Sequence, residues 1–216
     1  MKYLPFAVLL ILFSCGSSGG DSSPATTAPA VAPETTVRFL WREPRFDEVF
    51  QDTVSVLVLD EEYCKTIPDA ERAALGYVAT FIGNECEWDG DYTDDRSNLK
   101  CKILTALDLG YQCSEQHLGF LRKWFSTDNK VLIALTPENC PTTPDGASVA
   151  ETFDEITLTT KDNYIIVSYK VSGYDMRAAE IWTRDATMYF QHYEGGIQLV
   201  DGKKSEPVHK PMYEEQ

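Results

Sequence analysis

The sequence lacks the short motifs that mark common enzyme sites. It has no HExxH zinc motif and no glycine-rich phosphate loop, and it has only three histidines. It also lacks a CxxC pair, which argues against a zinc ribbon and a thioredoxin-like redox site. We therefore expect no cofactor and no metal, and we favour a non-catalytic protein over an enzyme.

Basic residues are scarce. The chain has 19 Lys and Arg residues against 34 Asp and Glu residues, which gives a formal net charge of −15 at pH 7. This field repels nucleic acid phosphates and anionic lipid surfaces alike. The composition therefore excludes nucleic acid as a partner and indicates a well-solvated surface.

Long apolar stretches are also missing, apart from one near the N-terminus. Residues 4–13 form a ten-residue run after Lys2, and as a helix this run is about 15 Å long, half the thickness of a bilayer's hydrocarbon core. One cation before such a run is the layout of a secretory signal. Residues 16–35, rich in Gly, Ser, Pro, Ala and Thr, predict a flexible tether.

The residues Leu12-Phe13-Ser14-Cys15 resemble the lipobox of bacterial lipoproteins, although Phe13 is bulkier than usual. The resemblance covers about residues 1–20. It implies that residues 1–14 are a cleaved signal peptide, that Cys15 carries the lipid, and that acyl chains such as palmitate hold the protein in the cell envelope. Because Asp does not follow the cysteine, the resemblance implies the outer membrane. The alternative is an ordinary signal peptide cut between residues 14 and 20.

The remaining chain predicts one α+β domain over residues 36–201, followed by a polar, disordered tail over residues 202–216. Its expected architecture is a helical hairpin plus a third helix packed on an antiparallel β-meander. The expected helices span residues 67–85, 97–109 and 115–125. The expected strands span residues 37–41, 53–59, 131–135, 153–160, 164–171, 179–190 and 197–200.

Five cysteines follow Cys15, and export to an oxidising compartment favours disulfides. If the first two helices form an antiparallel hairpin, Cys64 lies near Cys113 and Cys86 lies near Cys101. This pairing leaves Cys140 free. The alternative pairs Cys113 with Cys140 and leaves Cys64 buried and reduced, and the sequence alone leaves both open.

Two further clusters have a functional and a simpler interpretation. Residues 85–95 are rich in oxygen ligands suited to calcium, but Asp94 and Lys100 break the EF-hand pattern, so a solvated loop is the alternative. Cys113 and His117 are spaced as a nucleophile and base might be, yet an oxidised cysteine beside a structural histidine fits the export context better.

Arg184 interrupts the apolar phase of the strand over residues 179–190, which also contains Trp182. An arginine on the apolar face of a sheet can hold an anionic ligand, so Arg184 and Trp182 are candidate ligand-binding residues. The alternatives are a bulge that turns the side chain outward, or an ion pair with Glu155 or Glu180.

These observations together predict a membrane-tethered protein of the cell envelope that binds a partner protein or a small ligand without catalysis. The alternative is an envelope hydrolase or isomerase with its site in the concavity of the sheet.

Overall fold

The computed structural model describes residues 34–49, 51–81, 99–141 and 149–213. The predicted signal peptide, Cys15, most of the tether and the acidic segment 85–95 lie outside these ranges. Within them the chain forms five helices and seven strands. The helices are α1 (Glu61–Thr66), α2 (Asp69–Phe81), α3 (Leu99–Ala106), α4 (Glu115–Trp124) and α5 (Asn129–Ala134). The strands are β1 (Thr35–Asp47), β2 (Asp52–Leu59), β3 (Val149–Lys161), β4 (Tyr164–Asp175), β5 (Glu180–Tyr193), β6 (Gly196–Lys204) and β7 (Val208–Pro211).

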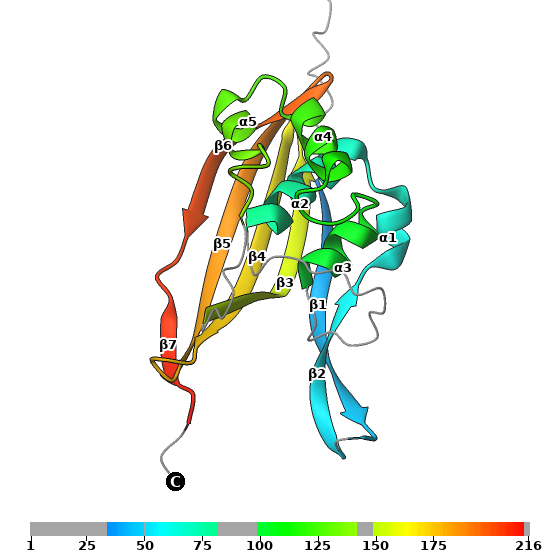
Figure 1. Ribbon diagram of the computed structural model, residues 1–216. Coiled ribbons are helices and arrows are strands. Elements are labelled where there is room, and N and C mark those ends of the chain that lie inside the picture. Colours follow the sequence, from blue (N-terminus) through cyan, green and yellow to red (C-terminus); the bar gives the residue numbers. More distant parts are fainter. Residues whose placement is uncertain (1–33, 50, 82–98, 142–148, 214–216) are drawn as a thin grey trace, which may run out of the picture. The chain divides into compact units, whose positions relative to one another are not determined.

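The strands form one antiparallel sheet in the order β2-β1-β3-β4-β5-β6. Strand β7 also pairs with β5, so β6 and β7 occupy the same edge one after the other (Figure 1). The meander β3–β6 turns tightly at residues 162–163 and 194–195, where Asp162 and Gly195 have φ angles of +54° and +83°. The α+β class and the antiparallel sheet are confirmed.

The core lies between the sheet and the helices, which gather on one face of the sheet (Figure 1). Burial alternates along β4, where Val167, Tyr169 and Val171 are buried and the residues between them are more exposed. Helix α2 crosses this face and packs closely at Gly76, where a β-carbon would lie 2.6 Å from Leu109. A glycine at this position therefore sets how closely α2 approaches the next layer.

The paired strands β1 and β2 extend past the point where β1 leaves β3. Strand β1 pairs with β3 only as far as Leu40, and its remaining residues pair with β2 alone. Arg42 holds this arm to the sheet, because its Nε donates to Oδ1 of Asp154 at 2.8 Å. Asp154 lies at a register shift in β3 and also accepts a hydrogen bond from Ser172.

Two predictions about the fold are wrong. Residues 131–135, expected as a strand, lie mostly in α5, whose first turn is capped by Asp128: Oδ1 accepts from the Val131 N–H at 3.2 Å and Oδ2 from the Leu199 N–H at 3.0 Å. The tail was predicted to be disordered from residue 202, but β6 continues to Lys204 and β7 pairs with β5. These segments lie at an exposed edge of the sheet, where polar residues are tolerated, so their sequence lacks the apolar pattern that would predict a strand.

Candidate functional site

Arg184, the candidate ligand residue, forms an ion pair with a carboxylate of β3. One guanidinium nitrogen is 3.0 Å from Oε1 of Glu151, and the two side chains are 22% and 25% exposed. The guanidinium carbon also lies 5.4 Å from the centre of the Trp182 ring. An ion pair of Arg184 is one of the alternatives that the sequence offers, but the partner is Glu151 and not Glu155 or Glu180.

Strand register explains this meeting. Glu151 of β3 is opposite Gly173 of β4, and Gly173 is opposite Trp182 of β5. Gly173 has no side chain to stand between Glu151 and Trp182, and Arg184 lies two residues further along β5, opposite Val171. An anion at this position would have to displace Glu151 from Arg184, so the geometry favours a structural ion pair over a receptor.

Tyr169 lies on the same face of the sheet and is almost fully buried. Its hydroxyl has no hydrogen-bond partner within the described residues. Burial is the main cause that raises the pKa of Tyr169 to about 12, while the positive charge of Arg184 acts in the opposite direction. The phenol therefore stays protonated and adds no charge to this part of the sheet.

The predicted disulfide between Cys64 and Cys113 is wrong. Cys113 is bonded to Cys140, with Cα atoms 6.0 Å apart, and Cys64 is a free thiol. Gln112 shows the physical reason, because its side-chain nitrogen donates to the carbonyl of Pro141 at 3.1 Å and so brings the two neighbouring cysteines together. The side chains of the other predicted pair, Cys86 and Cys101, lie outside the described residues.

His117 is fully buried and uses both ring nitrogens for hydrogen bonds within the protein. Its Nδ1 accepts from the backbone N–H of Cys113 at 3.0 Å, and its Nε2 lies 2.9 Å from Oγ1 of Thr80. The Thr80 hydroxyl donates to the Gly76 carbonyl at 2.7 Å, so it accepts from Nε2–H. His117 is thus a neutral structural imidazole, and Cys113 is not its nucleophile.

The structure shows a different candidate site, an open pocket of about 550 Å³ between the end of β2 and helices α1, α2 and α3. We call it the helical pocket. Its volume lies within the range of about 300–1,000 Å³ that is typical of small-molecule sites. Its lining combines apolar, cationic, acidic and hydroxyl side chains: Leu59, Cys64 and Ala106; Lys65, Arg72 and Lys102; Glu61 and Asp108; and Thr105.

The cations of the helical pocket differ in how they are neutralised. Lys65 is exposed and lies 2.8 Å from Glu62. Arg72 is 24% exposed, and one of its terminal nitrogens lies 3.4 Å from Asp69. Lys102 is half-buried, and its ammonium donates a hydrogen bond to the Leu57 carbonyl at 3.3 Å. These three cations come from separate helices, so no sequence motif could have grouped them.

The thiol of Cys64 is a weak nucleophile. Burial, followed by the negative charges of Asp60 and Glu61, raises the pKa of Cys64 to about 11. The thiolate is therefore scarce near neutral pH, and the thiol acts mainly as an apolar surface of the pocket.

No three or more His, Cys, Asp or Glu side chains are grouped to hold a metal ion in the part of the chain that the structure describes. No helix in those ranges has the length and apolar character needed to cross a membrane. No family model matches the chain, and neither a curated protein nor a solved structure matches it.

Proposed function

We propose that this protein is a lipid-anchored, non-catalytic binding protein of the cell envelope, most consistent with the outer membrane, and that the helical pocket is its ligand site. The anchor rests on the lipobox-like residues 12–15 and the tether that follows them. The binding role rests on one observation, an open pocket of about 550 Å³ whose lining mixes apolar side chains with three cations and two acids. Such a lining suits a small molecule with an apolar body and a few polar groups.

Three features favour binding over catalysis. None of the three histidines lines the helical pocket within the described residues. The pocket's one thiol, Cys64, is held protonated near neutral pH by its raised pKa. The sheet face, where the sequence analysis placed the alternative enzyme site, contains the Arg184–Glu151 ion pair instead of a nucleophile beside a base.

The predicted helical hairpin supports the same proposal. Helices α2 and α3 contact each other, and both contribute to the pocket lining. We propose that they are the antiparallel pair expected from the sequence, with residues 82–98 as their connection. This arrangement would place Arg72 and Lys102 on adjoining helices.

The anchor is tested by the intact mass of protein extracted from membranes. We expect the mass of residues 15–216 plus acyl groups, and we expect the Cys15→Ala variant to lose membrane retention. The Cys64→Ala variant is the matched control and should stay in the membrane fraction. Unchanged retention of Cys15→Ala would rule out the proposed anchor.

The binding role is tested with N-phenyl-1-naphthylamine, an uncharged apolar fluorophore. We expect saturable fluorescence enhancement with one site per chain, and loss of that enhancement in Ala106→Trp, which fills the pocket. The control is Val208→Trp, because Val208 is 60% exposed on β7, far from the pocket lining. Equal titrations of the wild type and Ala106→Trp would show that the pocket is not the site.

A further inference from the structure

Resting on the proposed function, we infer that the ligand of the helical pocket is an anionic amphiphile, with a carboxylate or phosphate head and a short apolar body. The head group is assigned to the cations of α2 and α3, and the body to the apolar side chains beside them. The positive charges of the pocket lining would be complementary to the negative head group of such a ligand.

Lys102 is the first of the two cations that would bind the head group. Its ammonium is half-buried, and its recorded partner within the described residues is the backbone carbonyl of Leu57. A carbonyl oxygen has only a partial negative charge, so it does not balance the full positive charge of the ammonium. No carboxylate among the described residues forms an ion pair with Lys102, whereas Lys65 and Arg72 each have one. An anionic oxygen in the pocket would supply the missing partner.

Arg72 provides the second cation. Its Nε is buried and has no hydrogen-bond partner within the described residues, while a terminal nitrogen makes the longer, 3.4 Å contact with Asp69. The guanidinium also lies over the Phe120 ring at 5.9 Å, which orients its plane. The buried Nε is closed to a ligand, but the terminal nitrogens of a planar guanidinium are suited to bind a carboxylate or a phosphate.

The acids of the lining set the direction of binding. Glu61, together with Asp60, acts on Cys64 at the α1 side, and the exposed Asp108 follows α3. Asp60 and Glu61 repel an anionic head from the α1 side, and Asp108 repels it from the C-terminal end of α3, so Arg72 and Lys102 remain as its partners. The apolar body then lies along Leu59, Cys64 and Ala106, where a protonated thiol costs little to cover.

Four small probes test the head group and the apolar body separately: octanoate, 1-octanol, octylamine and acetate. Titration calorimetry or NMR on the full chain should show that octanoate binds at least tenfold more tightly than octylamine or acetate. Octanoate should also bind about tenfold more tightly than 1-octanol, because only octanoate has the anionic head. Replacement of acetate by inorganic phosphate tests whether a free anion is enough.

The variant Lys102→Met should lower the affinity for octanoate about tenfold and leave the affinity for 1-octanol unchanged. Lys102→Arg should retain octanoate binding, and the exposed Lys203→Met is the matched control for loss of one positive charge. Equal affinities for octanoate and 1-octanol would overturn the anionic ligand and leave the binding function intact. Tight binding of phosphate alone would overturn the amphiphile. Failure of the wild type to bind N-phenyl-1-naphthylamine, or equal binding by Ala106→Trp, would instead overturn the proposed function.

Discussion

The backbone N–H of Cys113 donates to Nδ1 of His117 over 3.0 Å, at a residue whose φ angle is +63°. A non-glycine residue in this left-handed region costs about 1–2 kcal/mol. The hydrogen bond to a fully buried ring and the disulfide to Cys140 hold the backbone in that conformation. The histidine is therefore part of the support for the disulfide.

Replacing His117 by alanine should lower the free energy of unfolding by about 2–4 kcal/mol, because it leaves a cavity and removes the partners of Cys113 and Thr80. Urea unfolding followed by circular dichroism measures the change. The control His209→Ala removes a 51% exposed ring and should change stability by less than about 0.5 kcal/mol. A loss of similar size in both variants would contradict the structural role of His117.

Removing the disulfide in a Cys113→Ala/Cys140→Ala variant should destabilise the protein by roughly 3–4 kcal/mol, because the bond closes a loop of 27 residues in the unfolded chain. Chemical denaturation measures this, with Cys64→Ala as the control for loss of a thiol. Peptide mapping without reductant should recover Cys113 joined to Cys140. A peptide that joins Cys64 to Cys113 would show the pairing to be wrong.

The Arg184→Met variant should have a free energy of unfolding about 1–3 kcal/mol lower than the wild type. The loss is smaller than for a fully buried ion pair because both side chains are partly exposed. The double variant Arg184→Met/Glu151→Leu should recover part of this loss, since no unpaired charge remains. The control is Arg38→Met, which breaks an exposed pair with Glu155 and should cost less than about 1 kcal/mol. Equal effects of Arg184→Met and Arg38→Met would argue against a structural pair.

Cys64 should react slowly in the folded protein, because its pKa is raised from 9.0 to about 11. At pH 8, iodoacetamide should alkylate it about 100-fold more slowly than in urea, and the native rate should rise about tenfold per pH unit up to pH 11. The folded state holds the thiol proton more tightly, so this group's contribution to stability is lost between pH 9 and 11. Glu61→Gln should speed the reaction, and equal rates in the folded and unfolded protein would exclude the raised pKa.

Regular amphipathic helices were the easiest elements to predict. Apolar residues recur at three-to-four spacing from Ala70 to Phe81, which predicts α2, and a serine directly before an amphipathic segment, as at Ser114, predicts a helix cap. The Ser114 hydroxyl indeed accepts from the backbone N–H of His117 at 3.2 Å at the start of α4. Sequence patterns are reliable here because the cap and the apolar face are both local features.

Features that depend on distant partners could not be read from the chain. Helix α5 is short and apolar enough to resemble a strand, and its cap Asp128 is also tied to Leu199, 71 residues away. The partner of Arg184 is 33 residues away on β3, beyond a shift in register. The helical pocket needs three helices and a strand end to be assembled, so only its individual cations are visible in the sequence.

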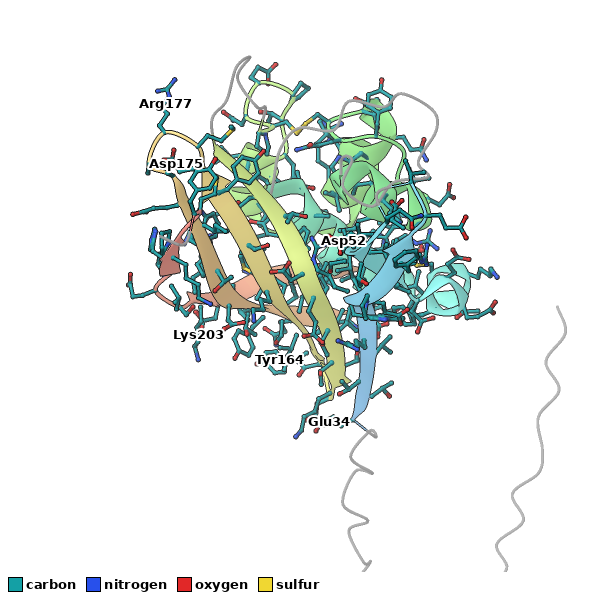
Figure 2. All side chains as sticks on the ribbon, turned by 90° about the horizontal axis from the view of Figure 1, so that it is seen from below. Glu34, Asp52, Tyr164, Asp175, Arg177 and Lys203 are labelled. Carbon is teal, nitrogen blue, oxygen red and sulfur yellow. A yellow bond between two sulfur atoms is a disulfide. The ribbon has the colours of Figure 1, made fainter. Side chains whose placement is uncertain are left out.

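The direction of the strands places the entry of the chain and the β1–β2 arm at opposite ends of the sheet. The chain enters the sheet at Thr35, beside Thr160 and close to the β3–β4 turn, and Figure 2 shows Glu34 and Tyr164 together at that end. Asp175 and Arg177 mark the opposite end, toward which the β1–β2 arm also runs (Figure 2). Under the proposed anchor, the chain joins the domain at the Glu34 end of the sheet, so the β4–β5 turn and the arm lie at the end that carries no connection to it.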